Sequence, residues 1–318
     1  MSSKTSKKQV RRLGDVVFSR SAVFAGIMIM VTLAAVALFL IMSSLPAFTA
    51  TKEEANLLNH AGNFWAYVAP LIFGTVWAAF LALVIAFPLA IGIALFISHY
   101  APRKLASMLG YVIDLLAAVP SVVFGLWGSL VIAPAAIPIY TWMSNTFGHI
   151  PGLSLLFGEK VTGTGKTILT VAIVLAVMIL PIMTAICREV FLQAPRLHEE
   201  AALALGATRW EMIRMAVLPF GRSGAVAAAM LGLGRALGET MAVAMVLSAT
   251  GLVSFQLLTD QNPSTIAANI ALQFAEGGFG VNKSVLIATG LVLFVITFIV
   301  NAAARWVVSR RAEFSGAN

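Results

Sequence analysis

The sequence predicts an all-α integral membrane protein with six transmembrane helices, and composition is the first reason. Hydrophobic residues make up 60% of the 318 residues, charged residues only 11%, and the mean hydropathy is +0.94. A soluble domain carries about 25% charged residues, so this composition excludes a water-soluble fold. The second reason is that six apolar stretches are each long enough for a span of about 20 residues. They are residues 22–42, 68–98, 109–133, 168–186, 225–250 and 285–308.

The third reason is the distribution of positive charge along the chain, whose net charge is +8. Of the 21 Lys and Arg residues, Arg235 lies inside a predicted span. Sixteen lie on the side that holds both termini, and four lie on the other side, namely Lys52, Lys160, Lys166 and Lys283. Basic residues concentrate on the cytoplasmic side of membrane proteins, so we expect both termini in the cytoplasm. The basic charge is thereby explained by topology and not by a nucleic-acid site.

The elements follow in chain order from these spans. Residues 1–20 are a polar cytoplasmic tail, and 21–66 hold the first span and an external loop. The first apolar core, about 21 residues, exceeds the 7–15 of a signal peptide, so we expect a retained helix. Residues 67–308 form a core of five spans with a cytoplasmic connection at 188–224, and 309–318 form the second tail.

Three features of the connections and spans carry further expectations. The stretch 63–98 is too long for one upright helix, so we expect it to begin with an interfacial segment anchored by Trp65 and Tyr67. Pro88 and Pro120 are expected as kinks within spans. The external connections are expected at residues 43–67, 134–167 and 251–284.

No residue pattern predicts a metal, nucleotide or catalytic site in this chain. Cys187 is the one cysteine, and the four histidines are scattered without ligand spacing: His60, His99, His149 and His198. Residues 163–167 end like a phosphate-binding P-loop, but Lys160 stands where that motif requires glycine. No span carries a nucleophile, base and metal constellation, so a membrane-embedded enzyme is disfavoured.

A helix-turn-helix knob is predicted in the polar connection between the fourth and fifth spans. Residues 195–205 are rich in helix formers, and Gly206 is placed as a left-handed stop after them. Thr208 and Glu211 have the spacing of a capping box, which would start a second helix running to about residue 217. Pro219 is expected to close this second helix.

The knob also carries an ordered motif: Glu200, Ala201, Ala202, Gly206, Leu218 and Pro219. This spacing resembles the EAA loop of the membrane subunits of ABC importers, with Ala216 in place of an isoleucine. The resemblance implies that the knob docks into a groove on a cytoplasmic ATPase subunit, which binds ATP and magnesium. No cofactor is then expected in this chain itself. The alternative is an amphipathic loop that only connects two spans.

Two opposite charges stand in the predicted fifth span. Arg235 lies about 15 Å into it, near the bilayer midplane. An ionised side chain there costs at least about 2.5–3.5 kcal/mol, so it needs a partner or a watery path. Glu239 follows four residues later, on the same face of a continuous helix. One interpretation is a buried ion pair that fixes packing; the other is an arginine that handles an anion and whose charge Glu239 tunes.

Two segments sharpen the resemblance, residues 235–242 and residues 114–128. Both resemble the PstC family of membrane subunits of the high-affinity phosphate importer. The resemblance implies the type I ABC importer permease fold in the bacterial inner membrane, and import of phosphate by alternating access. It also implies a heterodimer with a PstA-like permease, a PstB-like ATPase dimer and a PstS-like external phosphate-binding protein.

The expected phosphate pathway passes Arg235, whose fork of donors suits a tetrahedral oxyanion. Glu239 can accept the O–H of hydrogen phosphate, which sulfate lacks at neutral pH. Ser121 is a candidate lining hydroxyl, and Asp114 a candidate cap or interhelical partner. Two alternatives stay open: a permease for sulfate or molybdate, and a secondary transporter in which Glu239 or Asp114 is the ion-linked carboxylate.

Overall fold

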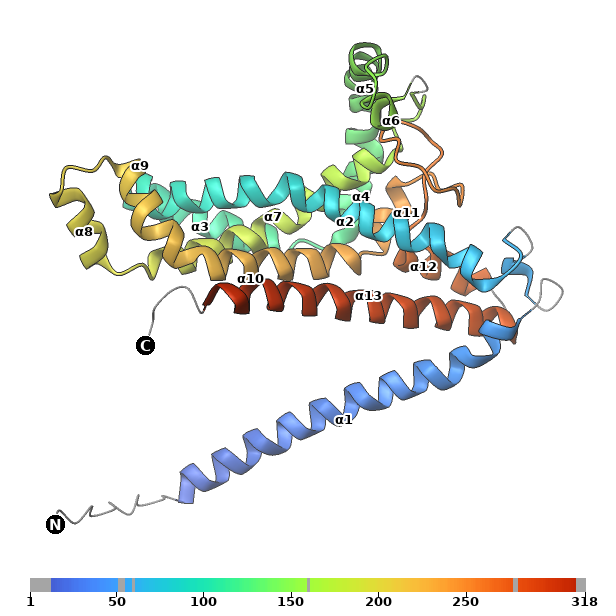
Figure 1. Cartoon of the computed structure of the whole chain (residues 1–318), viewed down its shortest axis with the longest axis horizontal. Coiled ribbons are helices and arrows are strands. Elements are labelled where there is room, and N and C mark those ends of the chain that lie inside the picture. Colours follow the sequence, from blue (N-terminus) through green and yellow to red (C-terminus); the bar gives the residue numbers. More distant parts are fainter. Residues whose placement is uncertain (1–12, 51–54, 59–60, 159–160, 277–279, 313–318) are drawn as a thin grey trace.

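The computed structural model describes residues 13–50, 55–58, 61–158, 161–276 and 280–312, and helices dominate this part of the chain (Figure 1). The described residues form no strand, and one isolated bridge joins Ala249 to Asn262. Within these ranges, six helices are long and apolar enough to cross a membrane, which confirms the predicted number. They are Gly14–Thr49, Phe64–Tyr100, Ser121–Phe147, Ile168–Leu192, Arg209–Leu237 and Val281–Ala303.

The core lies where α2 (Phe64–Leu95), α7 (Ile168–Leu192) and α10 (Leu218–Leu237) pack along one another (Figure 1). Alanines recur at every fourth position of α2, and each is at most 1% exposed: Ala78, Ala82, Ala86, Ala90 and Ala94. This spacing places them on one helical face, where small side chains let helices approach closely. Gly232 likewise lets α10 approach α7 closely, since a Cβ at this position would lie 2.7 Å from the sulfur of Met183.

The second span is continuous from its first residue. Asn63 caps α2 by accepting a hydrogen bond from the N–H of Ala66 at 2.8 Å. The helix then runs through Pro70 and Pro88 to its end. This one capped helix already includes Trp65 and Tyr67, so an interfacial segment at the start of this stretch stays a prediction.

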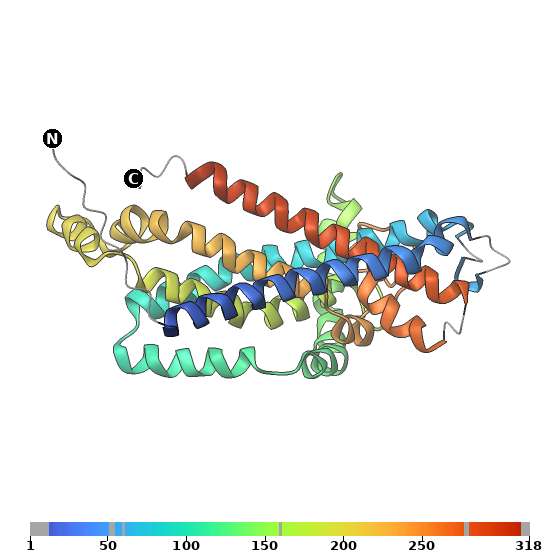
Figure 2. The ribbon, with the colours of Figure 1, turned by 90° about the horizontal axis from the view of Figure 1, so that it is seen from below.

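The first helix, α1 (Leu13–Thr49), is attached mainly at one end. Its last turns join a buried apolar cluster with the starts of α2 and of α13 (Val281–Ala312): Ala47, Ala55, Leu58, Phe64, Val68, Val285 and Ala288. From there α1 diverges from the other helices toward its N-terminal end (Figure 1), and in the view from below it runs along the length of the bundle (Figure 2). The retained first helix is thus confirmed as a helix, and most of its apolar surface is exposed.

The predicted third span, 109–133, is wrong as a single helix. The chain forms α3 (Arg103–Ala117), breaks at Pro120, and continues through α4 (Ser121–Trp127) into α5 (Ala133–Phe147). Residues 134–147, expected in an external connection, are helical and project away from the bundle (Figure 1). The residues on both sides of the break at Pro120 are mostly apolar. A hydropathy pattern therefore shows one continuous apolar run and does not reveal the break.

Each of three π-helical turns in the described residues is followed closely by a proline. The turns are η2 (Phe96–Tyr100), η3 (Gly128–Ile132) and η4 (Ile213–Val217), and each ends two residues before a proline: Pro102, Pro134 and Pro219. A proline lacks an N–H and its ring clashes with the carbonyl four residues earlier. At η3 and η4 the widened turn relieves that clash and the helix continues, whereas at η2 the helix ends because Ala101 is extended.

The end of the knob shows the effect of such a turn. We expected Pro219 to close the second helix, and that expectation is wrong. Instead α9 (Arg209–Met212) passes through η4 directly into α10, and Pro219 lies in the first turn of α10, where its missing N–H is tolerated. One helical rod therefore runs from Arg209 to Leu237.

The predicted fifth span, 225–250, is also shifted. The rod ends at Leu237, Gly238 to Thr240 interrupt the helix, and the short α11 (Met241–Val246) follows. Non-helical backbone then leads to α12 (Ile266–Glu276). Asn262 holds this backbone in place: its amide bonds the carbonyl of Thr259 at 2.8 Å and accepts from the N–H of Ile168 at 3.2 Å.

Candidate functional site

The first candidate site is the knob, and its local design is confirmed. Helix α8 (Arg196–Ala204) ends before Gly206, whose φ of +86° is the left-handed conformation that glycine adopts without strain. The Thr208 hydroxyl accepts from the N–H of Glu211 at 3.3 Å, and the Glu211 carboxylate accepts from the N–H of Thr208 at 2.8 Å. This reciprocal capping box starts α9 as expected.

The motif residues of the knob divide between its two faces. Ala202 and Leu218 pack against a buried apolar cluster formed by the ends of α2 and α7, by α9 and η4, and by α10. Glu200, Ala201, Gly206 and Pro219 are exposed. Two large apolar side chains accompany them on the surface, Leu197 at 76% and Leu205 at 91% exposure. Four of the six predicted motif residues thus lie in α8 and the turn after it, whereas Leu218 and Pro219 lie in the first turn of α10. The outer face of the knob combines apolar and charged groups.

The second candidate site surrounds Arg235, in the last turn of α10. Its side chain is partly buried, and its Nε is fully shielded without a hydrogen-bond partner among the described residues. A shielded, unpaired guanidinium N–H is costly unless it meets an acceptor. The location at a helix C-terminus favours the positive charge, because the helix dipole is negative there. Arg235 stays a predicted substrate-pathway residue, with Nε as a buried donor that lacks a partner among the described residues.

Glu239 does not pair with Arg235 in this structure, contrary to the expectation of one shared helical face. The helix ends between them, and Glu239 is 8% exposed. Its carboxylate accepts from the N–H of Ala242 at 3.1 Å and so binds the first turn of α11. The correction follows from Gly238, which interrupts the helix that the four-residue spacing assumed.

The two segments that carry the phosphate-importer resemblance meet in space. A Cβ at Gly125 of α4 would lie 2.8 Å from Cα of Ala242 in α11, so the two backbones touch. A Cβ at Gly128 would lie 2.5 Å from a methyl carbon of Val174 and 3.0 Å from a methyl carbon of Val246. Glycine is required at both positions because no side chain fits between the helices.

The other two predicted pathway residues are less closely placed. Ser121 is partly buried in the first turn of α4, just after Pro120. Asp114 is exposed on α3, on the other side of the proline break. Neither makes a hydrogen bond or ion pair with Arg235 or Glu239 within the described part of the chain. The packing of α4 on α11 keeps Ser121 a candidate, whereas nothing in the geometry joins Asp114 to Arg235.

Thr184 on α7 is a polar group that we did not single out from the sequence. Its hydroxyl is completely buried, and no partner for it lies among the described residues. Thr75 on α2 shows the usual alternative: its hydroxyl donates to the carbonyl of Leu71 at 2.6 Å and accepts from the N–H of Ile266 at 2.9 Å. Sequence alone offers no signal that separates these two threonines.

Comparison with known proteins gives consistent matches. Residues 86–313 match the family described as binding-protein-dependent transport system inner membrane component. The phosphate transport system permease protein PstC 2 of Mycobacterium tuberculosis is 45% identical over 303 residues, covering 92% of this chain and 91% of that protein. PstC of Pasteurella multocida is 37% identical over 307 residues, covering 95% and 94%. A chain of the inward-facing MetNI methionine ABC transporter is 18% identical, with a TM-score of 0.47, covering 76% of this chain and 94% of that chain.

Proposed function

The chain belongs to the family of binding-protein-dependent transport system inner membrane components, and from this premise we propose that it is the phosphate permease subunit of an ATP-driven importer. The observation that carries the proposal is similarity to phosphate permeases over nearly the whole chain, at 45% and 37% identity. The family match itself includes the knob, Arg235 and Glu239. The six apolar helices agree with a multi-pass protein of the bacterial inner membrane.

The continuous rod suggests how ATP is coupled to transport. Its first turn is the capped start of α9 in the knob, and its last turn carries Arg235. A partner ATPase that grips the knob would move this rod, and with it the guanidinium at the far end. Alternating access then follows if the rod's two positions expose Arg235 to opposite sides of the membrane.

The substrate chemistry rests on the shielded Nε of Arg235. An arginine stays charged and offers parallel N–H donors, which match the oxygens of phosphate. Glu239, held near the start of α11, would distinguish hydrogen phosphate from sulfate by accepting a hydrogen bond from the O–H group that only hydrogen phosphate carries. Ser121, on the helix that contacts α11, would supply a further hydroxyl.

The remaining components are assigned by the same family logic. A PstA-like permease would complete the pathway, a PstB-like ATPase dimer would bind ATP and magnesium, and a PstS-like protein would deliver phosphate from outside. The exposed Leu197 and Leu205 give the knob apolar anchors for the ATPase. An ion-coupled transporter would have no use for such a knob, which favours the ATP-driven mechanism over that alternative.

Phosphate import by the assembled complex is the first expected result. The chain should co-purify with an ATPase subunit, and in liposomes its ATP hydrolysis should rise when phosphate-loaded binding protein is added outside. Sulfate-loaded or empty binding protein serves as the control. Phosphate uptake that persists without ATP, driven by a proton or sodium gradient, would instead establish the ion-coupled alternative.

Topology can be tested independently by cysteine labelling in a Cys187→Ser background. Single cysteines at Ser3 and Ala317, which lie outside the described residues, should react from the cytoplasm. A cysteine at Gly163 should react from outside, since that position is exposed and nothing lies within 4 Å of a Cβ there. Labelling of the Gly163 position from inside only would contradict the proposed orientation.

A further inference from the structure

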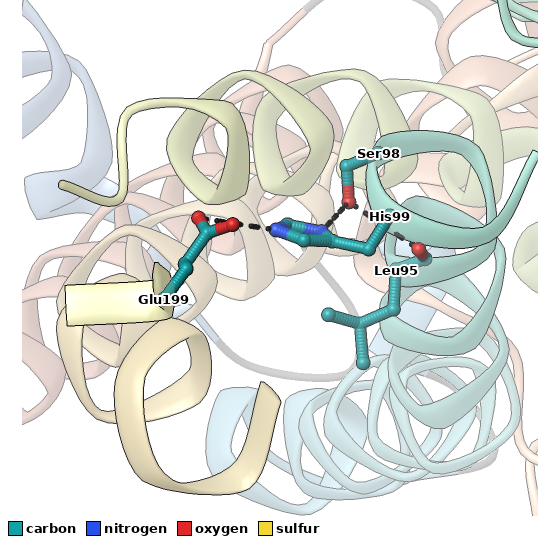
Figure 3. A network of polar contacts seen from close by, with 4 residues as sticks. All are labelled: Leu95, Ser98, His99 and Glu199. Carbon is teal, nitrogen blue, oxygen red and sulfur yellow. Dashed lines mark hydrogen bonds and ion pairs between the residues drawn. The ribbon is translucent and has the colours of Figure 1, made fainter. Parts of the chain in front are cut away.

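A chain of polar contacts joins the knob to the end of α2. His99 Nε2 lies 3.5 Å from Glu199 Oε1, and Ser98 Oγ lies 2.7 Å from His99 Nδ1 (Figure 3). The Ser98 hydroxyl also reaches the carbonyl of Leu95, at 3.4 Å. We call Ser98, His99 and Glu199 the clasp, because they run from the backbone of α2 to the side of α8.

The clasp is shielded, and it connects elements that are distant in sequence. The side chains of His99 and Glu199 are 9% and 21% exposed, so water competes less for their contact than it does at the surface. The Arg188–Glu189 ion pair is a useful contrast, because it joins neighbours on one helix and Glu189 is 59% exposed. Such a pair contributes little.

The surface of α8 shows why the clasp matters. Of the nine residues in this helix, only Glu199 and Ala202 are not exposed, and their three-residue spacing puts them on one face. Ala202 rests on the apolar cluster that includes Phe191 and Ile213, which belong to the segments flanking the knob. Of these two residues, Glu199 reaches His99 in η2, directly after α2 and much earlier in the chain. The adjacent Glu200 remains exposed.

His99 and Ser98 lie inside η2, the π-helical turn at the end of α2. Such turns interrupt the helix ladder locally and are frequent at functional sites. Ser98 contacts one ring nitrogen of His99, which orients the other nitrogen toward Glu199. The turn and the serine together hold the imidazole where α8 can meet it.

From this arrangement we infer that the clasp transmits movement of the knob to α2, and the inference rests on the proposed function. The chain itself links α8 to α7 on one side and to α10 on the other, but α2 has no covalent link to the knob. α2 packs along both α7 and α10, the two helices that flank the knob in the chain. The His99–Glu199 contact provides the link that the backbone lacks.

The test measures phosphate transported per ATP hydrolysed by the complete complex in liposomes. Glu199→Ala and His99→Ala should each lower this ratio about tenfold, which corresponds to about 1.4 kcal/mol of coupling. The ATPase subunit should still co-purify, because the outer face of α8 is unchanged. The double variant should be no worse than either single variant, since both remove the same contact. Matched controls are Glu189→Ala and His149→Ala, which should keep the wild-type ratio.

The outcomes separate this inference from the proposed function. A wild-type complex without ATP-dependent phosphate uptake would overturn the function itself. If the wild type is active and both single variants keep its ratio of phosphate transported to ATP hydrolysed, only the clasp is overturned. The clasp is also overturned if the double variant loses as much as the two single losses multiplied together. Loss of ATPase binding would show that Glu199 merely shapes the docking surface. If the alanine variants do not assemble, Glu199→Asp shortens the carboxylate by one methylene; a reduced ratio supports the clasp and an unchanged ratio contradicts it.

Discussion

Arg235→Gln is expected to abolish phosphate uptake while leaving the complex assembled. The substitution removes the positive charge but keeps a polar side chain, whose amide reaches about as far as Nε of arginine, so we expect helix packing to be preserved. Because Nε of Arg235 is shielded and unpaired among the described residues, its removal should not break a hydrogen bond of that atom. We expect a loss of at least about a hundredfold in uptake, roughly the effect of losing one charge-assisted interaction of about 3 kcal/mol. Uptake of labelled phosphate into liposomes, with loaded binding protein outside, measures the effect.

Two companion variants define what the guanidinium does. Arg235→Lys keeps the charge but loses the fork, so partial uptake or a changed anion preference is expected. Glu239→Gln keeps an acceptor for the N–H of Ala242 and so should keep α11 in place. If Glu239 accepts the proton of hydrogen phosphate, this variant should discriminate less against sulfate. Wild-type uptake by an assembled Arg235→Gln complex would remove Arg235 from the pathway.

The parts of the structure that were predictable from sequence are those set by local signals. The capping box of Thr208 and Glu211 satisfies backbone groups within one turn, and a positive φ at Gly206 depends on that residue alone. Span number was equally accessible, because about 20 apolar residues suffice to indicate a span. The corresponding predictions were confirmed without knowledge of packing.

The proline and glycine positions were harder, because their outcome depends on neighbouring turns. Pro88 continues a helix, Pro120 breaks one, and Pro219 begins one after a π-helical turn. All three lie in apolar surroundings, so a hydropathy pattern treats them alike. Because the helix breaks at Gly238, Glu239 does not lie on the same helical face as Arg235. The four-residue spacing assumed a continuous helix and could not show this break.

Contacts between distant segments were not predictable at all. His99 and Glu199 form their pair only because the end of α2 lies beside the knob. Gly125 of α4 and Gly128 of η3 must be glycine because of close contacts with α11 and α7, and these contacts are visible only in the structure. The sequence supplied the candidate chemistry of Arg235 and the motif of the knob, whereas tertiary packing decided which partners these groups meet.

Gly206→Val is expected to uncouple ATP hydrolysis from transport, which would confirm that the knob works as a rigid unit. The left-handed backbone at φ +86° costs a non-glycine residue about 1–2 kcal/mol, and more for a β-branched one. Nothing lies within 4 Å of a Cβ at this position, so the penalty comes from the backbone and not from a clash. The turn between α8 and α9 should therefore rearrange and carry the exposed face of α8 with it.

The matched control is Gly206→Asn, because asparagine tolerates the left-handed region and has the same room around it. The valine variant should insert and assemble, since no span is altered, but its phosphate uptake per ATP should fall about tenfold or more. The asparagine variant should stay within about threefold of wild type, as expected if only the backbone preference matters. Normal transport with normal stimulation of ATP hydrolysis in the valine variant would show that the geometry of this turn does not govern coupling. If both variants lose the same amount of phosphate uptake per ATP, the cause is instead a partner's contact with Gly206. Valine and asparagine differ in backbone preference and share only the added bulk, which would obstruct such a contact.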